Sequence, residues 1–123
     1  MFRDFTYIDD VIEIIERLLD KPATPSIGFT RDETDPSKSW APYKIFNIGN
    51  SNTINLMDFI NALEKELGRK SIKEFEPMQK GDVQITSAET TAIEKWVNFK
   101  PNTSIAFGVK NFVNWYKKYY QLN

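Results

Sequence analysis

The chain has 123 residues, of which 41% are hydrophobic and 14% aromatic, and its formal net charge is −1. This composition is typical of one folded domain, and the scattered charges argue against nucleic-acid binding, which needs a concentrated basic patch. Because Cys and His are absent from the sequence, disulfides, thiolate nucleophiles, Ser-His triads and most zinc or haem sites are excluded. We therefore expect a single domain over residues 1–123, without a metal site.

The sequence also bears on membranes and location. No apolar run approaches the ~20 residues of a membrane-spanning helix, and the first residues lack the charged and apolar regions of a secretory signal. We expect no membrane insertion and a cytoplasmic location.

The first predicted elements are a short strand and a helix. Residues 1–8 alternate apolar and polar side chains, as a strand does. Asp9 and Asp10 then predict a helix cap and an acidic first turn, followed by a broad apolar face that ends before Pro22. Residues 20–42 contain four prolines and little periodicity, which we interpret as a slack surface loop, with an insertion or lid as the alternative.

Residues 43–68 predict a strand, a polar turn and a helix. Ile45, Phe46 and Ile48 form the apolar strand, Asn55 is the expected helix cap, and Gly68 is placed to end the helix in a left-handed conformation. A polar turn at the end of a strand is a good rim for a ligand. An ordinary structural unit is the simpler interpretation.

The remainder predicts short elements. Residues 71–75 and 83–86 indicate extended segments, and a short helix begins at Thr90 or Thr91, with Asn98 left-handed at its end. Ser104 is the expected cap of a last helix, whose predicted buried stripe is Ile105, Val109, Phe112, Val113 and Tyr116. The fold class is therefore α/β or α+β, with a few short strands and about four helices.

The sequence offers no catalytic device. Asp9, Asp10 and Glu13 could be paired carboxylates or Mg²⁺ ligands, but acids in a first helical turn are explained by the helix dipole. Trp115 with the two tyrosines near the end could form an aromatic platform, and tail packing is the simpler interpretation. Neither G-x-G-x-x-G nor Tyr-x-x-x-Lys is present. We expect no catalytic, cofactor-binding or metal-binding residue.

Five blocks carry a family resemblance. Residues 3–10, 42–50, 56–60, 77–83 and 99–104 have the order and spacing found in the carboxy-terminal third of extended short-chain dehydrogenase/reductases. Among these the chain most resembles the NAD-dependent UDP-glucuronate 4-epimerases of bacterial capsule and lipopolysaccharide synthesis. The resemblance implies a lobe that closes over a UDP-sugar. It also implies that the Rossmann domain, with NAD and the Tyr-x-x-x-Lys pair, is missing from this chain.

The resemblance implies five substrate-binding residues. Arg3 matches the arginine that binds the diphosphate, a role that suits a guanidinium fork, and Phe5 matches an aromatic position near the uridine. Asn47 matches an asparagine that contacts substrate in related dehydratases. Gln79 and Asp82 match a loop that contacts the nucleotide, although other sugar epimerases have arginine in place of Gln79.

Two functional hypotheses remain. In the first, the chain is the substrate-binding lobe of a nucleotide-sugar 4-epimerase and is not catalytic by itself. In the second, it is a free-standing interaction or regulatory module that keeps the fold and uses an exposed apolar face for self-association or for a partner.

Overall fold

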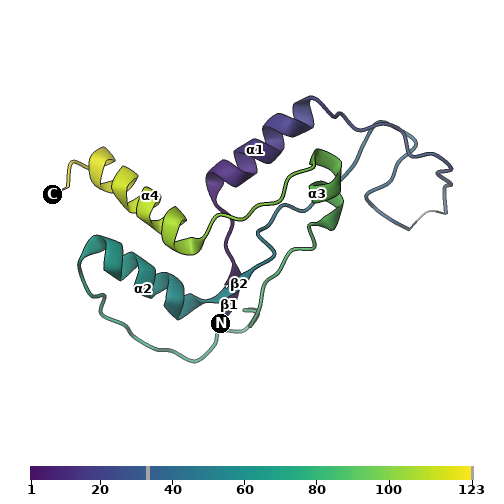
Figure 1. Cartoon of the computed structure of the whole chain (residues 1–123). Helices are drawn as coiled ribbons and strands as arrows, with labels where there is room; N and C mark the ends of the chain where they lie inside the picture. Colours follow the sequence, from purple (N-terminus) through teal and green to yellow (C-terminus); the bar gives the residue numbers. More distant parts are fainter. Residues whose placement is uncertain (33, 123) are drawn as a thin grey trace.

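The computed structural model describes residues 1–32 and 34–122. The described part contains β1 (Phe2–Asp4), α1 (Ile8–Leu19), β2 (Thr53–Asn55), α2 (Leu56–Leu67), α3 (Thr91–Val97) and α4 (Ile105–Tyr119). The helices form two pairs, α1 with α3 and α2 with α4, and the small sheet lies between the pairs (Figure 1). The predicted fold class, few short strands and about four helices, is confirmed.

β1 is flanked on both edges. It pairs antiparallel with β2 on one edge, and on the other the segment around Gln84 runs parallel to it. There Phe2 N donates to Gln84 O at 2.8 Å and Thr86 N donates to Phe2 O at 3.2 Å. Two residues further along, side-chain oxygens accept the hydrogen bonds in place of backbone carbonyls. Asp4 N donates to Thr86 Oγ1 at 3.4 Å, and Ala88 N donates to Asp4 Oδ2 at 3.4 Å. The parallel pairing therefore continues through side-chain acceptors where the regular ladder ends.

The main core lies between α1 and α3. Ile14, Ile93 and Val97 are buried together, and partly buried side chains pack around them, namely Leu18, Phe46, Ile48, Trp96 and Phe99. α4 adds the buried Val109 and Val113, on the face that packs against α2. This core is small, so individual buried side chains carry a large share of the stability.

The predicted helix ends at four positions are confirmed. Asn55 and Ser104 accept hydrogen bonds from first-turn amides of α2 and α4, at 2.9 and 3.3 Å. Gly68 and Asn98 end α2 and α3 with φ of 68° and 50°, both left-handed. These local signals depend only on neighbouring residues, which is why the sequence shows them.

The predicted cap of α1 is wrong. The N-cap is Tyr7, without a side-chain cap, and both aspartates lie inside the first turn. Asp10 is buried, and its Oδ2 accepts a hydrogen bond from Thr103 N at 3.2 Å. Asp10 therefore fastens the start of α1 to the α3–α4 connection.

Two predicted strands are also absent from the described residues. The segments 45–48 and 71–75 belong to no strand in the structure, because a strand needs a partner for its ladder and no described segment pairs with either. The predicted extended piece at 83–86 does pair, through a parallel bridge of Phe2 with Ile85. The described part of residues 20–42 forms no helix or strand, as the proline-rich composition predicted.

The apolar helix faces are only partly covered. On α1, Ile14 is fully buried, whereas Ile8, Ile12, Ile15 and Leu19 are exposed, Leu19 at 77%. On α4, the predicted buried stripe is partly wrong, because Phe112 and Tyr116 are exposed beside the buried valines. No helix within residues 1–32 and 34–122 has the length and apolar character needed to cross a membrane.

Candidate functional site

The Asp4 carboxylate lies at the junction of three chain segments. Its Oδ1 accepts hydrogen bonds from Asn50 N at 3.2 Å and Asn52 N at 3.5 Å, and its Oδ2 accepts one from Ser51 N at 3.1 Å. Ser51 has φ of 51°, in the left-handed region. Successive amides in such a turn form a concavity that binds anions, and here the bound anion is the Asp4 side chain.

Gly49 makes this junction compact. A Cβ at Gly49 would lie 2.7 Å from the Cβ of Ala88 and 3.0 Å from Asp4 Oδ2, so the close approach of the backbone requires glycine. Sequence reasoning missed Asp4. The available signal was an acidic residue inside a strand pattern, where aspartate is unfavourable without a specific partner.

Arg3 lies on β1, one residue before this junction. The side chain is half-buried, and its Nη1 donates to Phe2 O at 2.9 Å and to Gln84 O at 3.4 Å. Two other predicted site residues, Gln79 and Asp82, lie in an exposed turn closed by Asp82 N donating to Gln79 O at 3.2 Å. That turn ends two residues before Gln84. It therefore directly precedes, along the chain, the segment that Arg3 contacts.

Asn47 lies elsewhere. Its neighbours Phe46 and Ile48 pack against the core, whereas Asn47 is exposed. Within the described part of the chain, no hydrogen bond joins Asn47 to Arg3 or Asp82. The assignment of these residues to a substrate therefore stays a prediction.

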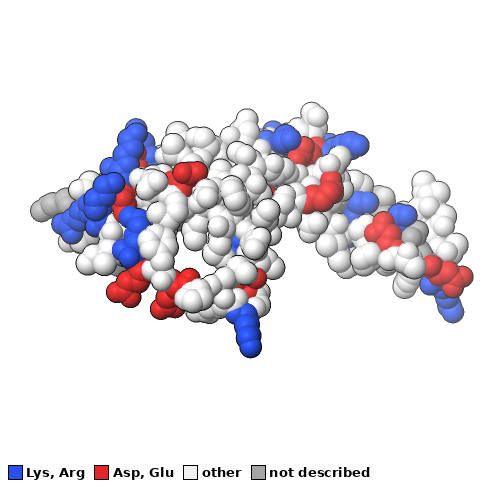
Figure 2. All heavy atoms as spheres, turned by 90° about the horizontal axis from the view of Figure 1, so that it is seen from below, with Lys and Arg blue, Asp and Glu red and all other residues white. Residues whose placement is uncertain are grey.

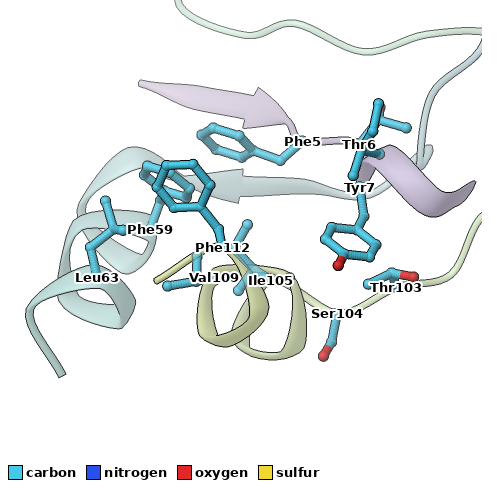
Figure 3. A pocket seen from close by; sticks show the side chains of 12 residues that line it. Phe5, Thr6, Tyr7, Phe59, Leu63, Thr103, Ser104, Ile105, Val109 and Phe112 are labelled. Carbon is cyan, nitrogen blue, oxygen red and sulfur yellow. The ribbon is translucent and has the colours of Figure 1, made fainter. Parts of the chain in front are cut away.

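Phe5 lines an apolar hollow between the β1–α1 connection, α2 and α4 (Figure 3). Its ring stacks on Phe59 with centroids 4.4 Å apart and planes within 8°. The hollow has a volume of about 300 Å³, and its other walls include Tyr7, Leu63, Ile105, Val109 and Phe112. Phe5 is the one predicted site residue among its lining residues. An aromatic wall of this kind suits a planar or apolar group.

Tyr7 supplies a polar group at the edge of this hollow. Its hydroxyl accepts a hydrogen bond from Asn111 Nδ2 at 3.2 Å, and a Cβ at Gly108 would lie 3.1 Å from its ring. Tyr7 is therefore fixed between α1 and α4.

A second polar cluster lies at the end of α2. The buried Glu64 carboxylate accepts hydrogen bonds from Ser71 N and Oγ at 2.9 and 2.6 Å, bonds to Lys73, and pairs with Lys70 at 3.0 Å. Lys73, and after it Ser71, hold the pKa of Glu64 well below its usual range. The carboxylate stays ionised and fastens residues 70–73 to α2, so its role is structural. The described residues contain no cluster of acidic side chains arranged for a metal.

Charge is unevenly placed on the surface. In Figure 2 white, uncharged residues cover much of the middle of one face, whereas Lys, Arg, Asp and Glu are more numerous toward its left and right ends, with a few near the centre of the lower edge. Exposed apolar side chains are also numerous, including Ile72, Phe75 and Trp115. Much of the apolar surface of this chain is thus uncovered.

Comparison with known proteins relates the fold to one class of protein. The arrangement matches the carboxy-terminal part of NAD-dependent nucleotide-sugar epimerases of the extended short-chain dehydrogenase/reductase type, and the expected resemblance is confirmed. A solved UDP-glucuronic acid 4-epimerase from Bacillus cereus, in complex with UDP-glucuronic acid and NAD, is 25% identical with a TM-score of 0.69. The match covers 97% of this chain and 33% of that chain.

The chain is also similar in sequence to curated proteins, two of which are described below. Protein CapI of Staphylococcus aureus is 45% identical over 121 residues, which are 98% of this chain and 36% of CapI. A probable UDP-glucuronate 4-epimerase of Rhizobium meliloti is 39% identical over 122 residues, again 98% of this chain and 36% of the relative. The chain thus spans about a third of the length of these relatives. No protein-family model matches it.

Proposed function

We propose that this chain is the substrate-binding lobe of a UDP-glucuronate 4-epimerase and acts in the cytoplasm, without catalytic activity by itself. The observation that carries the proposal is the 39% identity to a probable UDP-glucuronate 4-epimerase across 98% of this chain. The solved structure with UDP-glucuronic acid and NAD, at 25% identity, supports the same substrate class.

The residues of this chain do not fit NAD. The glycine-rich dinucleotide loop and the Tyr-x-x-x-Lys pair are absent from the sequence. NAD supplies hydride transfer when bound to an epimerase, and we assign that chemistry to a further domain. The role left to this chain is to hold and orient the substrate.

Arg3 is the proposed diphosphate ligand. A guanidinium has five N–H donors in a fixed fork, and the contacts of Arg3 within the described residues use Nη1 alone. The Nη2 and Nε donors therefore remain for phosphate oxygens, in the bidentate geometry that arginine favours. Phe5 is the proposed aromatic neighbour of the uridine, and Asn47, Gln79 and Asp82 are proposed polar contacts.

The uncovered apolar surface supports the need for a second domain. The exposed stripe of α1, formed by Ile8, Ile12, Ile15 and Leu19, repeats at helical spacing as a buried face does. The segment 43–48 has an apolar strand pattern and belongs to no strand. A Rossmann domain that supplied a strand and a packing surface would cover both.

Binding of UDP tests this proposal. We expect weak binding to the chain, with NMR shifts at Arg3, because half of an enclosed site is missing and affinity depends on enclosure. Submicromolar binding would contradict the incomplete site. Arg3→Ala should abolish the response, whereas Arg31→Ala, in the exposed loop, should leave it unchanged. Equal binding by both variants would contradict the phosphate role.

A free-standing interaction module is the second candidate function, and the exposed α1 stripe favours it. In that case the stripe would mediate self-association, and Ile15→Glu would dissociate the assembly in sedimentation equilibrium. A wild-type chain that sediments as a monomer at high concentration would count against this candidate.

A further inference from the structure

The Asp4 carboxylate makes contacts that serve neither the core nor a helix. On one side it binds the amides of the turn at Asn50, Ser51 and Asn52, at 3.1 to 3.5 Å. A turn that aims successive N–H groups at one point forms a concavity that favours an anion. Asp4 supplies that anion from within β1.

On the other side, Asp4 extends the parallel pairing of β1. Its backbone N donates to Thr86 Oγ1, and its Oδ2 accepts from Ala88 N, each at 3.4 Å. Its carboxylate stands where a backbone carbonyl would accept in a regular ladder. One side chain therefore fixes both neighbours of β1.

We propose that Asp4 is a positioning residue for the nucleotide-sugar site, because it fixes β1 and thereby places Arg3 beside the segment that follows the Gln79–Asp82 turn. The inference rests on the proposed function and deepens it. Arg3 directly precedes Asp4, and its Nη1 contacts Gln84 O at 3.4 Å. A shift of the 84–88 segment would therefore move both the guanidinium and the turn.

The geometry requires a carboxylate. In the described structure, the Asp4 carboxylate is bonded only by backbone N–H donors, so both of its oxygens must accept. Asparagine has the same shape but offers one oxygen and an NH₂ group, which would face an N–H donor. Asp4→Asn thus tests the role with almost no change in volume.

The experiment is a UDP titration of the ¹⁵N-labelled chain. Asp4→Asn is compared with Asp9→Asn, which removes the same charge from an exposed position in α1. The indole signal of Trp96, whose Nε1 donates to Lys21 O, reports the fold, and the Arg3 Nε–Hε signal reports the site. We expect Asp4→Asn to keep the Trp96 signal and to weaken UDP binding on the order of tenfold or more, with the Arg3 response lost. Asp9→Asn should bind like the wild type.

Equal UDP affinity of folded Asp4→Asn and wild type would overturn this inference and leave the proposed function standing. If the wild type gives no response to UDP, the proposed function and the inference fail together. Should Asp4→Asn unfold, Thr86→Val removes only the Oγ1 acceptor of Asp4 N. That variant should weaken UDP binding about threefold, as loss of one modest hydrogen bond does, and unchanged affinity would overturn the inference.

Discussion

Replacing Ile14 by alanine should lower the free energy of unfolding by about 3 kcal/mol. Ile14 is 0% exposed and packs against Ile93 and Val97. The change removes about three carbon groups, worth ~0.8 kcal/mol each in transfer free energy. The remaining cavity adds to this, within the range of about 2–5 kcal/mol seen for such truncations.

The neighbouring Ile15 provides the control. It is 46% exposed, so Ile15→Ala should cost only about 1 kcal/mol, since roughly half of the transfer term applies and no cavity forms. Urea unfolding gives both values if the denaturant slopes of the variants agree. It can be followed by tryptophan fluorescence, to which Trp96 beside the same core contributes. Equal losses for the two variants would refute the α1–α3 core as described.

Three further predictions concern the cap of α2, the close approach at Gly49 and the ion pair of Glu64. Asn55→Ala removes the side-chain cap of α2 and should cost about 1 kcal/mol in urea unfolding; no loss would refute the cap. Gly49→Ala places a Cβ 2.7 Å from that of Ala88 and should lower the free energy of unfolding by about 1–3 kcal/mol through overpacking. An unchanged Tm would contradict the close approach. Because Lys73 lowers the pKa of Glu64 from 4.5, the ionised form stabilises the fold above that pH, and the stabilisation is lost as the pH falls below it. The Tm difference between wild type and Glu64→Gln should therefore shrink below pH 4.5, and a constant difference would contradict the ion pair.

The confirmed parts of the fold are those that a short window of sequence determines. The caps at Asn55 and Ser104 and the left-handed ends at Gly68 and Asn98 each depend on a few adjacent residues. The segments 45–48 and 71–75 have the apolar pattern of strands, but a pattern does not supply a pairing partner. The sequence alone therefore predicted four helix ends correctly, whereas two of its predicted strands have no partner among the described residues.

The burial of the apolar helix faces was predicted only in part, for a related reason. Periodicity shows which side of a helix is apolar, but it does not show what covers that side. Ile14 found partners on α3, whereas Ile12 and Leu19 on the same helix remain exposed.

The substrate-binding residues stay a prediction, although the structure shows where two of them lie. Arg3 and Phe5 came from a resemblance in the first block, and the structure places Phe5 in an aromatic hollow and Arg3 on β1. Asp4 lies between them and was missed, because its partners at Ser51 and Ala88 are distant in sequence. The one local signal, an aspartate inside a strand pattern, indicates that a partner exists but not which residues provide it.

The segment 43–48, which belongs to no strand and leaves Tyr43 and Ile45 exposed, has a consequence for how the chain behaves in a cell. Holdase chaperones bind extended apolar stretches whose backbone N–H and C=O groups are not paired in a sheet. Such stretches also promote aggregation. Wherever this chain is made without a covering domain, its abundance should depend on the quality-control machinery more than on its own small core.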